Sequence, residues 1–466
     1  MDIEAELKKR WPLLLILLFA FSIRTYFANA NIAIWWDEAQ YMLGARAYAR
    51  GEPSNVWEGR AFLFPLMLSP FAESEFGAKM LEIFFSLGTI TLVYLFCEKY
   101  FNKLTAFTAS LIMSSMWIDL FYSVRILSDV PAPFFIFLSL FLFLEKGKSV
   151  KKTFLSALFF AMAFIIRFPS AIGIFVVVLY GLFTKQYKEK TFYLWFLFLI
   201  LCISSLFVHD FFVYGDAFTS TRAFIEINLR FDSTGSVTDQ PWNFYINILP
   251  TVLTPLFLVF TGVGLVLLFM NINKGKSLFL ILYLFIFFLA LSSLTNKQDR
   301  FLTPILPVFS IIGSLGLVKS ANLIKKINQN ISIGIILILA LVVFAYQIDY
   351  GVGMISAKTE SYAEIKYAGE WIKANSDKDA VIATVSDPQI RYYSDRNSLV
   401  GFKSNFDDFI SELNNKTVDF YVVSMYEPMP DFMSGDLREY NLTIGNVWTK
   451  LFDGTEYAVA IVWVNN

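Results

Sequence analysis

Histidine and cysteine are scarce in this chain, and their scarcity excludes several kinds of site. His209 is the only histidine among 466 residues, so a metal centre built from several histidines is excluded. Cys97 and Cys202 both lie in apolar runs, which predicts neither a disulfide framework nor a zinc site. Charged residues make up 17% of the chain, against about 25% in soluble domains. The formal net charge of −1 gives no indication of a nucleic-acid partner.

What the chain has in abundance is apolar surface. Hydrophobic residues make up 56% of it, with 51 phenylalanines, more than a soluble core of this size could bury. The first run follows the charged segment Met1–Arg10 and is long enough to be an uncleaved first span. Because a spanning helix needs about 20 mostly apolar residues, we expect an all-α polytopic membrane domain of about eleven transmembrane helices. The runs are 11–29, 78–96, 104–121, 131–144, 153–167, 169–184, 192–212, 245–270, 277–294, 301–318 and 331–348.

The positions of lysine and arginine between these runs predict the orientation. If the N-terminus is cytoplasmic, every inner segment carries cations, as the positive-inside rule requires. Those cations are Lys8, Lys9, Arg10, Lys99, Lys103, Lys146, Lys148, Lys151, Lys152, Lys185, Lys188, Lys190, Lys274, Lys276, Lys319, Lys325 and Lys326. With an odd number of spans, residues 350–466 lie on the other side. We therefore expect a multi-pass cell-membrane protein with a cytoplasmic N-terminus and an extracytoplasmic C-terminal domain.

Residues 350–466 differ from the rest of the chain because they contain no spanning run. Helical spacing over 362–374 and strand-like segments at 380–385, 418–424 and 457–464 predict a small soluble α/β domain with one or two covering helices. The expected organisation is therefore a transmembrane domain followed by this extracytoplasmic domain. The transmembrane domain is expected over 1–349, with a first outer loop over 30–77, and the extracytoplasmic domain over 350–466.

The first outer loop carries a pair of acids. Asp37 and Glu38 follow Trp35 and Trp36, which are typical headgroup-level anchors. The next residues, 41–50, predict an amphipathic helix lying at the membrane interface. The acids are candidates for a general base. The alternative is an ordinary helix start, where carboxylates are favoured.

Two other outer connections carry cations beside apolar spans. Arg125 and Asp129 are four residues apart, so one helical turn would pair them. A purely structural ion pair at the membrane edge is the alternative. Arg167 ends the predicted fifth span, where an arginine near the bilayer is costly. The alternative there is a side chain that reaches along the helix to the interface.

The connection 295–307 places Lys297, Asp299 and Arg300 between two long apolar spans. A solvated turn would explain these charges, but not the two prolines that follow at helix-entry spacing. Acids and cations from separate loops therefore share one predicted surface. Chemistry on a lipid-linked anionic substrate needs such a set, because cations stabilise a departing phosphate while a carboxylate takes the proton of the attacking hydroxyl.

The order of these segments resembles the GT-C superfamily of membrane glycosyltransferases. The similarity is greatest to the branch of dolichyl-phosphate-mannose protein mannosyltransferases and lipid A aminoarabinose transferases, and it covers nearly the whole chain. In lipid-mannosyltransferase relatives a histidine can stand where this chain has Asn296. The segments that carry the resemblance are Asp37-Glu38-Ala39-x-Tyr41, Phe76-Gly77, Arg125-x-x-x-Asp129, Arg167, Lys297-Gln-Asp-Arg-Phe-Leu-x-Pro304 and 363–397.

The resemblance implies an inverting transfer of a sugar, mannose or another hexose, from a polyprenyl-phosphate donor to a protein, lipid or lipid-linked glycan. It implies that Asp37, with Glu38 beside it, is the catalytic carboxylate. The residues that it places near the donor phosphate are Lys297, Arg300, Arg125, Arg167 and Arg60. The supporting residues are Asp129, Asp299 and Tyr41. No cofactor is required, although a divalent cation held by Asp37, Glu38 and Asp129 remains open.

Two other classes of function fit a polytopic protein. A lipid or oligosaccharide flippase, or another transporter, usually has ionisable residues at mid-membrane, whereas the charges here gather at one predicted surface. A non-catalytic membrane assembly protein would make the charges incidental. Nucleotide sugars are made in the cytoplasm and are too charged to cross a bilayer, so chemistry on the outer face favours a lipid-carried sugar.

Overall fold

The computed structural model describes residues 10–52, 59–145, 149–230, 240–325, 328–424, 430–434, 442–452 and 455–464. Among the predicted inner cations, Lys8, Lys9, Lys146, Lys148 and Lys326 lie outside these residues. Contacts divide the chain into two compact units. The helical unit comprises Met1–Asn29, Trp57–Met67 and Ser74–Ser356, and the mixed unit comprises Ala30–Val56, Leu68–Glu73 and Ala357–Asn466.

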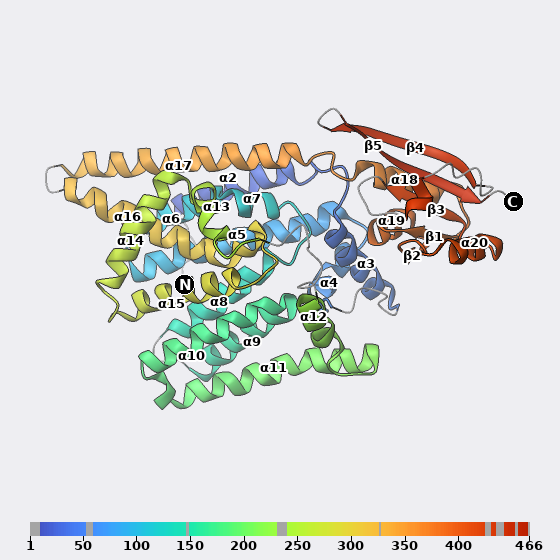
Figure 1. Cartoon of the computed structure of the whole chain (residues 1–466). Helices are drawn as coiled ribbons and strands as arrows, with labels where there is room; N and C mark the ends of the chain where they lie inside the picture. Colours follow the sequence, from blue (N-terminus) through green and yellow to red (C-terminus); the bar gives the residue numbers. More distant parts are fainter. Residues whose placement is uncertain are drawn as a thin grey trace. The chain divides into compact units, whose positions relative to one another are not determined.

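Each predicted span is helical in the helical unit (Figure 1). Its α-helices are α2 (Trp11–Phe27), α4 (Leu63–Leu68), α5 (Glu75–Tyr100), α6 (Lys103–Ser115), α7 (Trp117–Tyr122), α8 (Pro131–Leu144), α9 (Val150–Ile166), α10 (Gly173–Phe183), α11 (Lys190–Tyr214), α12 (Thr219–Arg230), α13 (Phe244–Leu253), α14 (Pro255–Phe269), α15 (Gly275–Ser292), α16 (Leu306–Lys325) and α17 (Gln329–Ala357). Its 3₁₀-helices are η2 (Phe168–Ile172), η3 (Gln186–Lys188) and η5 (Asp299–Ile305).

The apolar helices differ in length. Among the described residues, 5 helices are long and apolar enough to cross a membrane, or 6 if the pair α13 and α14, bent by 108°, is one span. The other predicted runs form shorter or interrupted helices. Backbone geometry explains one interruption, because Met116 leaves the helical conformation with φ −51° and ψ 118° and so separates α6 from α7.

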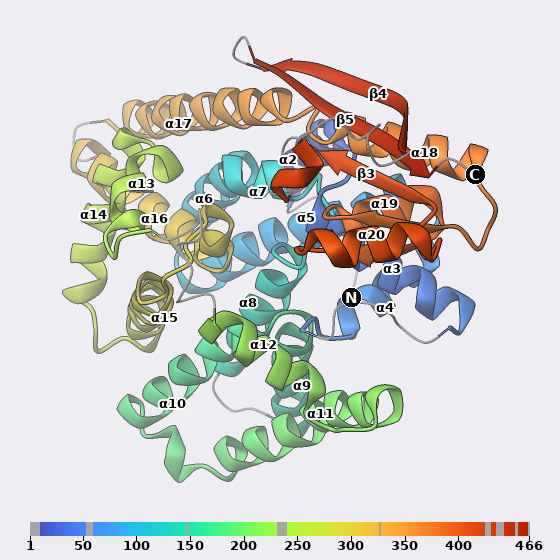
Figure 2. The same ribbon diagram turned by 45° about the vertical axis from the view of Figure 1, so that its right-hand side comes forward.

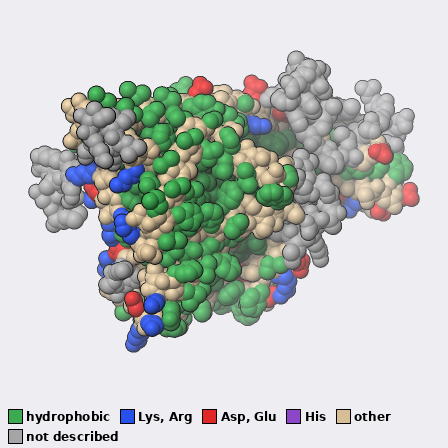
Figure 3. All heavy atoms as spheres, turned by 60° about the vertical axis from the view of Figure 1, so that its left-hand side comes forward, with side chains coloured by type: hydrophobic (Ala, Val, Ile, Leu, Met, Phe, Trp, Pro, Cys, Tyr) green, Lys and Arg blue, Asp and Glu red, His purple; other side chains and the backbone are tan. Residues whose placement is uncertain are grey.

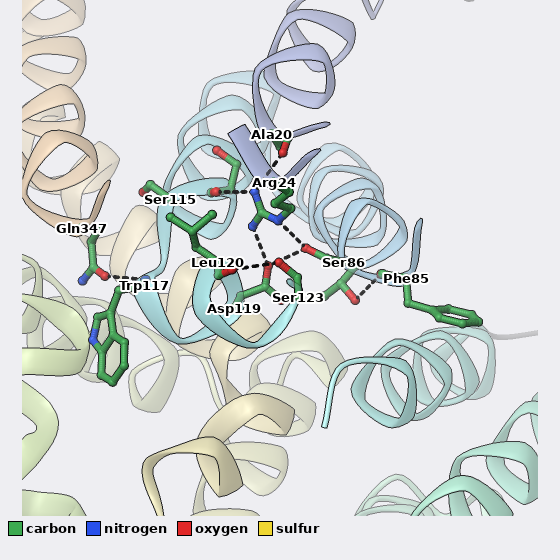
Figure 4. A network of polar contacts seen from close by, with 12 residues as sticks. Ala20, Arg24, Phe85, Ser86, Ser115, Trp117, Asp119, Leu120, Ser123 and Gln347 are labelled. Atoms are coloured by element: carbon green, nitrogen blue, oxygen red, sulfur yellow. Dashed lines mark hydrogen bonds and ion pairs between the residues drawn. The ribbon is translucent and has the colours of Figure 1, made fainter. Parts of the chain in front are cut away.

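A buried polar network holds α2 against α5 and α7 (Figure 4). Arg24, which is fully buried, donates to Asp119 Oδ2 over 2.7 Å and to Ser86 Oγ over 3.0 Å. The Ser86 hydroxyl donates to the same Asp119 oxygen over 2.6 Å. Where the helix breaks, Gln347 of α17 accepts the Trp117 N–H over 2.9 Å. A buried charge is tolerated only when it is paired and hydrogen-bonded in this way.

The outward surface of the helical unit is strongly apolar, as lipid contact requires. Figure 3 shows a wide apolar face with Lys and Arg gathered along one edge of it. In α11 only 17% of the spanning window is buried inside the protein. Predicted inner cations from different connections meet, because Lys99 and Lys152 both pair with Glu145. Lys276 donates to the carbonyl of Tyr100 at the same group of connections.

The mixed unit contains a five-stranded sheet in the order β2-β1-β3-β5-β4. Pairing is parallel for β1 with β2 and with β3, and antiparallel for β3 with β5 and β5 with β4. The three predicted strands are present, and two strands that the sequence did not predict complete the edges. The elements are η1 (Ser69–Phe71), α18 (Ala363–Asn375), β1 (Val381–Thr384), α19 (Asp387–Ser394), β2 (Asn397–Val400), α20 (Phe406–Asn414), β3 (Phe420–Ser424), η6 (Asp431–Ser434), β4 (Leu442–Phe452) and β5 (Thr455–Val464), together with the first-loop helix α3 (Trp36–Arg50).

Alternating strand residues give the sheet two apolar faces, and helices cover both (Figure 2). Ile382 of β1 packs with Ile365 of α18 and Ile390 of α19. Its neighbour Ala383 points to the other face and packs with Phe409 of α20. The covering helices therefore number three, one more than the sequence predicts at most.

The first-loop segment joins the C-terminal residues in this unit. The Ile34 N–H donates to the Tyr393 hydroxyl over 2.8 Å, and the Gln389 amide donates to the Ile34 carbonyl over 3.0 Å. The predicted helix over 41–50 is confirmed as part of α3, but much of α3 is buried against protein, including Tyr41 and Ala45. The expectation of a helix lying on the membrane interface took no account of this packing.

Candidate active site

Two arginines converge on one buried carboxylate in the helical unit. Arg167, which caps the C-terminus of α9, places Nη2 2.9 Å from Asp129 Oδ1 and donates from Nη1 to Ser128 Oγ over 3.3 Å. Arg300 of η5 places Nη1 3.9 Å from the other oxygen of Asp129. Asp129 is 1% exposed, whereas the two guanidinium side chains are 19% and 18% exposed. One carboxylate is therefore shared by two cations.

Both guanidinium groups lie beside one aromatic ring. Their Cζ atoms lie 5.3 Å and 5.8 Å from the centre of the Phe301 ring, for Arg167 and Arg300 respectively. Cation–π attraction at such distances stabilises a cation that is partly removed from water. We call Asp129, Arg167, Arg300 and Phe301 the arginine cluster.

Hydrogen bonds to the segment 298–300 fix the position of Arg300. The Arg300 N–H donates to Asp299 Oδ1 over 2.7 Å, and its Nε donates to Gln298 Oε1 over 2.7 Å. Tyr122 at the end of α7 donates its hydroxyl to Asp299 over 2.8 Å. Burial and the neighbouring Asp299 charge raise the pKa of Tyr122, so this hydroxyl stays protonated and remains a donor. Asp299 thus links Arg300 to Tyr122.

The segment between α7 and α8 differs from its prediction. Residues 123–130 form a run of turns and bends, so no helical turn links Arg125 to Asp129. The i,i+4 geometry expected from their spacing is therefore wrong, and Asp129 instead reaches Arg167 and Arg300. Arg125 is 1% exposed, and its guanidinium lies 5.0 Å from the centre of the Phe121 ring.

Arg60 is half-buried, and the segment that carries it packs beside the end of α9. The next residue, Ala61, packs in one cluster with Ile165 and Phe168, which flank Arg167 on either side. The structure therefore brings the backbone at Arg60 into the neighbourhood of the arginine cluster.

Lys297 has partners of a different kind from those of the arginines. Its Nζ donates to the Gln240 carbonyl over 2.8 Å and to the Leu294 carbonyl, and the residue is 5% exposed. It also lines a cavity of about 490 Å³ together with Trp242 and residues 292–295. Lys297 thus ties the connection before η5 to the segment before α13.

The two acids of the first loop have different surroundings in the mixed unit. Glu38 is 1% exposed, and its Oε2 accepts the Trp35 N–H over 2.6 Å. This is the helix-start role that was the alternative interpretation of the pair. Asp37 is half-buried in the first turn of α3, and Tyr41 is buried one turn later. Of the two carboxylates, Asp37 is therefore the more accessible.

A metal site built on these acids finds no support in the donor set. Glu38 holds a backbone N–H, and Asp129 holds two guanidinium groups, so each already has strong partners. Within the described parts of the chain, no group of 3 or more His, Cys, Asp or Glu side chains could hold a metal ion.

Several buried polar residues of the helical unit were not predicted from the sequence. Lys79 and Glu82 of α5 are 2% and 0% exposed within an apolar run, and ionisable residues inside a membrane segment are often functional. Their charge in a predicted span was the signal that could have found them. Tyr122 and Phe301 gave no such signal, because both lie among many aromatic residues.

Comparison with solved structures identifies the fold as GT-C-like. ArnT from Cupriavidus metallidurans, solved with undecaprenyl phosphate, matches with a TM-score of 0.72 and 12% identity over 96% of this chain and 97% of that one. The archaeal oligosaccharyltransferase AglB from Archaeoglobus fulgidus, solved with an inhibitory peptide and a dolichol-phosphate, matches with a TM-score of 0.66 and 11% identity over 97% and 74%.

The sequence itself matches a family model. The model of the Alg9-like mannosyltransferase family covers residues 11–385, more than three quarters of the chain. No curated protein sequence matches.

Proposed function

This chain belongs to the Alg9-like mannosyltransferase family, and from that premise we propose that it transfers a hexose, mannose in the first instance, from a polyprenyl-phosphate donor. The acceptor is a protein, a lipid or a lipid-linked glycan on the outer face of the membrane. Support for the donor class comes from the two structural neighbours, which were solved with undecaprenyl phosphate and with a dolichol-phosphate.

The arginine cluster is the observation that carries the proposal. Two partly exposed guanidinium groups converge on one buried carboxylate, which gathers the donors that a phosphate needs at one place. Arginine is suited to this task, because its planar donors match a phosphate in pairs. At an effective dielectric constant of about 20, a cation 4 Å from a phosphate charge contributes about 4 kcal/mol before desolvation.

The reaction balances without a redox partner. An acceptor hydroxyl attacks the anomeric carbon as the bond from that carbon to the phosphate oxygen breaks, with inversion. The bonding pair leaves on the polyprenyl phosphate, whose charge Arg167 and Arg300 stabilise. Asp37 takes the hydroxyl proton. Lys297 orders the connection that carries Arg300 through its contacts to two carbonyl oxygens, while Arg60 and Arg125 add positive charge.

Arg300→Gln tests the donor-phosphate role. It should weaken binding of a short-chain polyprenyl phosphate at least about tenfold, because a charge-assisted contact is lost, and should lower transfer in parallel. Arg222→Gln is the matched control, since Arg222 is 61% exposed and pairs only at the surface with Asp216. Thermal unfolding checks that the Arg300→Gln and wild-type proteins are both folded. Equal donor affinity of the two folded proteins would contradict the role.

A second experiment tests the reaction class and names the acceptor. Mass spectrometry of glycoproteins, glycolipids and lipid-linked glycans from cells with and without the protein should show one missing hexose when it is absent. A flippase would alter where a lipid-linked glycan accumulates without changing its composition. Unchanged composition in all three fractions would therefore remove the transferase proposal. Activity after chelation tests whether a divalent cation contributes.

A further inference from the structure

A second basic site lies within the mixed unit and shares no residue with the arginine cluster. It is a cavity of about 220 Å³ between the C-terminal half of α3 and residues 378–397. At about 30 Å³ per water, this volume holds several waters or a phosphate-sized anion. We call it the basic pocket. The cationic residues that line it are Arg46, Arg50, Lys378, Arg391 and Arg396, and the acidic ones are Glu52 and Asp395.

Contacts within the unit hold Arg46 on the wall of the pocket. Its guanidinium lies 4.0 Å from the centre of the Tyr392 ring, and Nη1 donates to the Tyr392 carbonyl over 2.6 Å. Its Nη2 lies 3.2 Å from a Glu73 oxygen. The Nε is buried and has no hydrogen-bond partner among the described residues. These contacts keep the Arg46 guanidinium, and its charge, on the wall of the pocket.

The other arginines of the wall divide into paired and unpaired groups. Arg50 pairs with Glu73 at 3.1 Å and with Asp395 at 3.5 Å. Arg396 donates to backbone carbonyls, including those of Lys373 and Ser376 at the end of α18, and it forms no ion pair with a carboxylate of the described residues.

Lys378 and Arg391 carry the uncompensated charge. Lys378 is exposed and Arg391 half-buried, and neither side chain forms a hydrogen bond or an ion pair with any residue in the described ranges. Arg391 is attracted by Asp387 of its own helix without an ion-pair contact. The five cations that line the pocket face the four acids Glu52, Glu73, Asp387 and Asp395, which leaves an excess of one positive charge. An anionic ligand would neutralise that charge, and phosphate oxygens match arginine donors in pairs.

We propose that the basic pocket binds a phosphate monoester or a diphosphate through Lys378 and Arg391, with the Arg46 guanidinium in its wall. The size of the cavity, the excess of positive charge and the guanidinium wall all match that chemistry. The phosphate can belong to a soluble molecule or to a lipid headgroup. The proposal does not depend on the glycosyl-transfer reaction.

Calorimetric titration of the full-length protein tests the pocket in two arms. The first titrates inorganic pyrophosphate into detergent-solubilised protein, and the second compares nanodiscs of phosphatidylcholine with and without phosphatidic acid. Lys378→Gln/Arg391→Gln should lose at least about tenfold in affinity, since two charge-assisted contacts are removed. Lys373→Gln is the control, because Lys373 is an exposed lysine of the same unit outside the pocket.

The arms separate the two sources of the phosphate. Binding of pyrophosphate that the double variant loses assigns a soluble ligand. Loss confined to phosphatidic acid assigns a lipid headgroup. Equal affinity of wild-type and double variant in both arms, or no binding by the wild-type protein in either, overturns the proposal. The side chains of Lys378 and Arg391 form no hydrogen bonds with the described residues that the substitutions could remove. Thermal unfolding checks that the double variant is folded.

Discussion

Neighbouring side chains of the same type have different surroundings in this protein, and those surroundings separate their roles. The carboxylate of Glu38 accepts the Trp35 N–H at 2.6 Å and is buried, whereas Asp37 is half-buried. Adjacent residues on a helix point about 100° apart, so one can complete the helix start while the other faces elsewhere. Sequence adjacency alone could not separate the two roles.

Substitutions at these two positions should therefore have opposite signatures. Asp37→Asn should abolish sugar transfer while leaving the thermal midpoint and donor binding close to wild-type, because only the base is removed. Glu38→Ala should lower the free energy of unfolding by about 1 kcal/mol or more, since a helix-start hydrogen bond is lost. Transfer assays and thermal unfolding of the same preparations check both. Wild-type turnover in Asp37→Asn would remove Asp37 from the mechanism.

At the scale of elements, close approach between helices depends on glycine. On α16, a Cβ added at Gly316 would lie 1.9 Å from the Phe260 carbonyl oxygen of α14. A Cβ at Gly264 of α14 would lie 2.0 Å from the Ile312 carbonyl oxygen of α16. Backbone atoms cannot move aside without separating the helices, as in membrane helix pairs that pack through small residues.

Gly316→Ala should consequently destabilise the helical unit by about 1–3 kcal/mol, as expected for overpacking. Gly262→Ala on α14 is the matched control, because nothing lies within 4 Å of its added Cβ. That control should be neutral or more stable by up to about 1 kcal/mol, from helix propensity. Thermal unfolding in detergent measures the difference. Equal midpoints for the two variants would show that the helices tolerate the added methyl group.

An acid between α8 and α9 links stability to pH. Burial raises the pKa of Glu145, but hydrogen bonds and charges from Lys152 and Lys99 outweigh burial and lower it below the ordinary value of 4.5. The folded state thus binds this proton less readily than the unfolded chain. Its contribution to stability is present above the unfolded pKa and is lost as pH falls through the lower folded pKa.

Glu145→Gln should accordingly reduce the loss of thermal stability on acidification between about pH 6 and pH 3, while lowering stability near neutrality. Glu189→Gln serves as the comparison, because Glu189 is an exposed acid at another connection and forms no ion pair among the described residues. Parallel midpoint-against-pH curves for wild-type protein and Glu145→Gln would refute the linkage.

At the scale of the whole molecule, the apolar surface and the distribution of lysine determine how the chain inserts into the membrane. Helix α11 keeps most of its side chains outside the protein core, which only lipid can solvate. Lysines that were predicted on one side do meet in the fold, at Glu145. The chain is a multi-pass membrane protein, and its orientation follows from the positive-inside rule as a prediction.

Cysteine labelling in intact cells checks that orientation. In a chain with Cys97 and Cys202 replaced, an impermeant maleimide should label Asp377→Cys, which is exposed in the mixed unit. It should not label Lys185→Cys until the membrane is permeabilised, because Lys185 belongs to a predicted inner segment. Labelling of Lys185→Cys before permeabilisation would reverse the orientation.

The membrane class, the apolar helices and the α/β character of the C-terminal residues were all predictable from the chain. They depend on long runs of similar residues, whose preference for lipid or for strand pairing is local. The breaks within the apolar runs were not predictable, because a break such as that at Met116 depends on whether a distant side chain, here Gln347, satisfies the exposed N–H.

The candidate site, by contrast, required the tertiary structure. Asp129, Arg167 and Arg300 are far apart in the chain, and their meeting depends on how α8, α9 and η5 pack. The carbonyl contacts of Lys297 arise in the same way. A charged residue can be recognised in a sequence, but its partner is chosen by distance in space. Packing therefore decides which charged side chains come together in the candidate site.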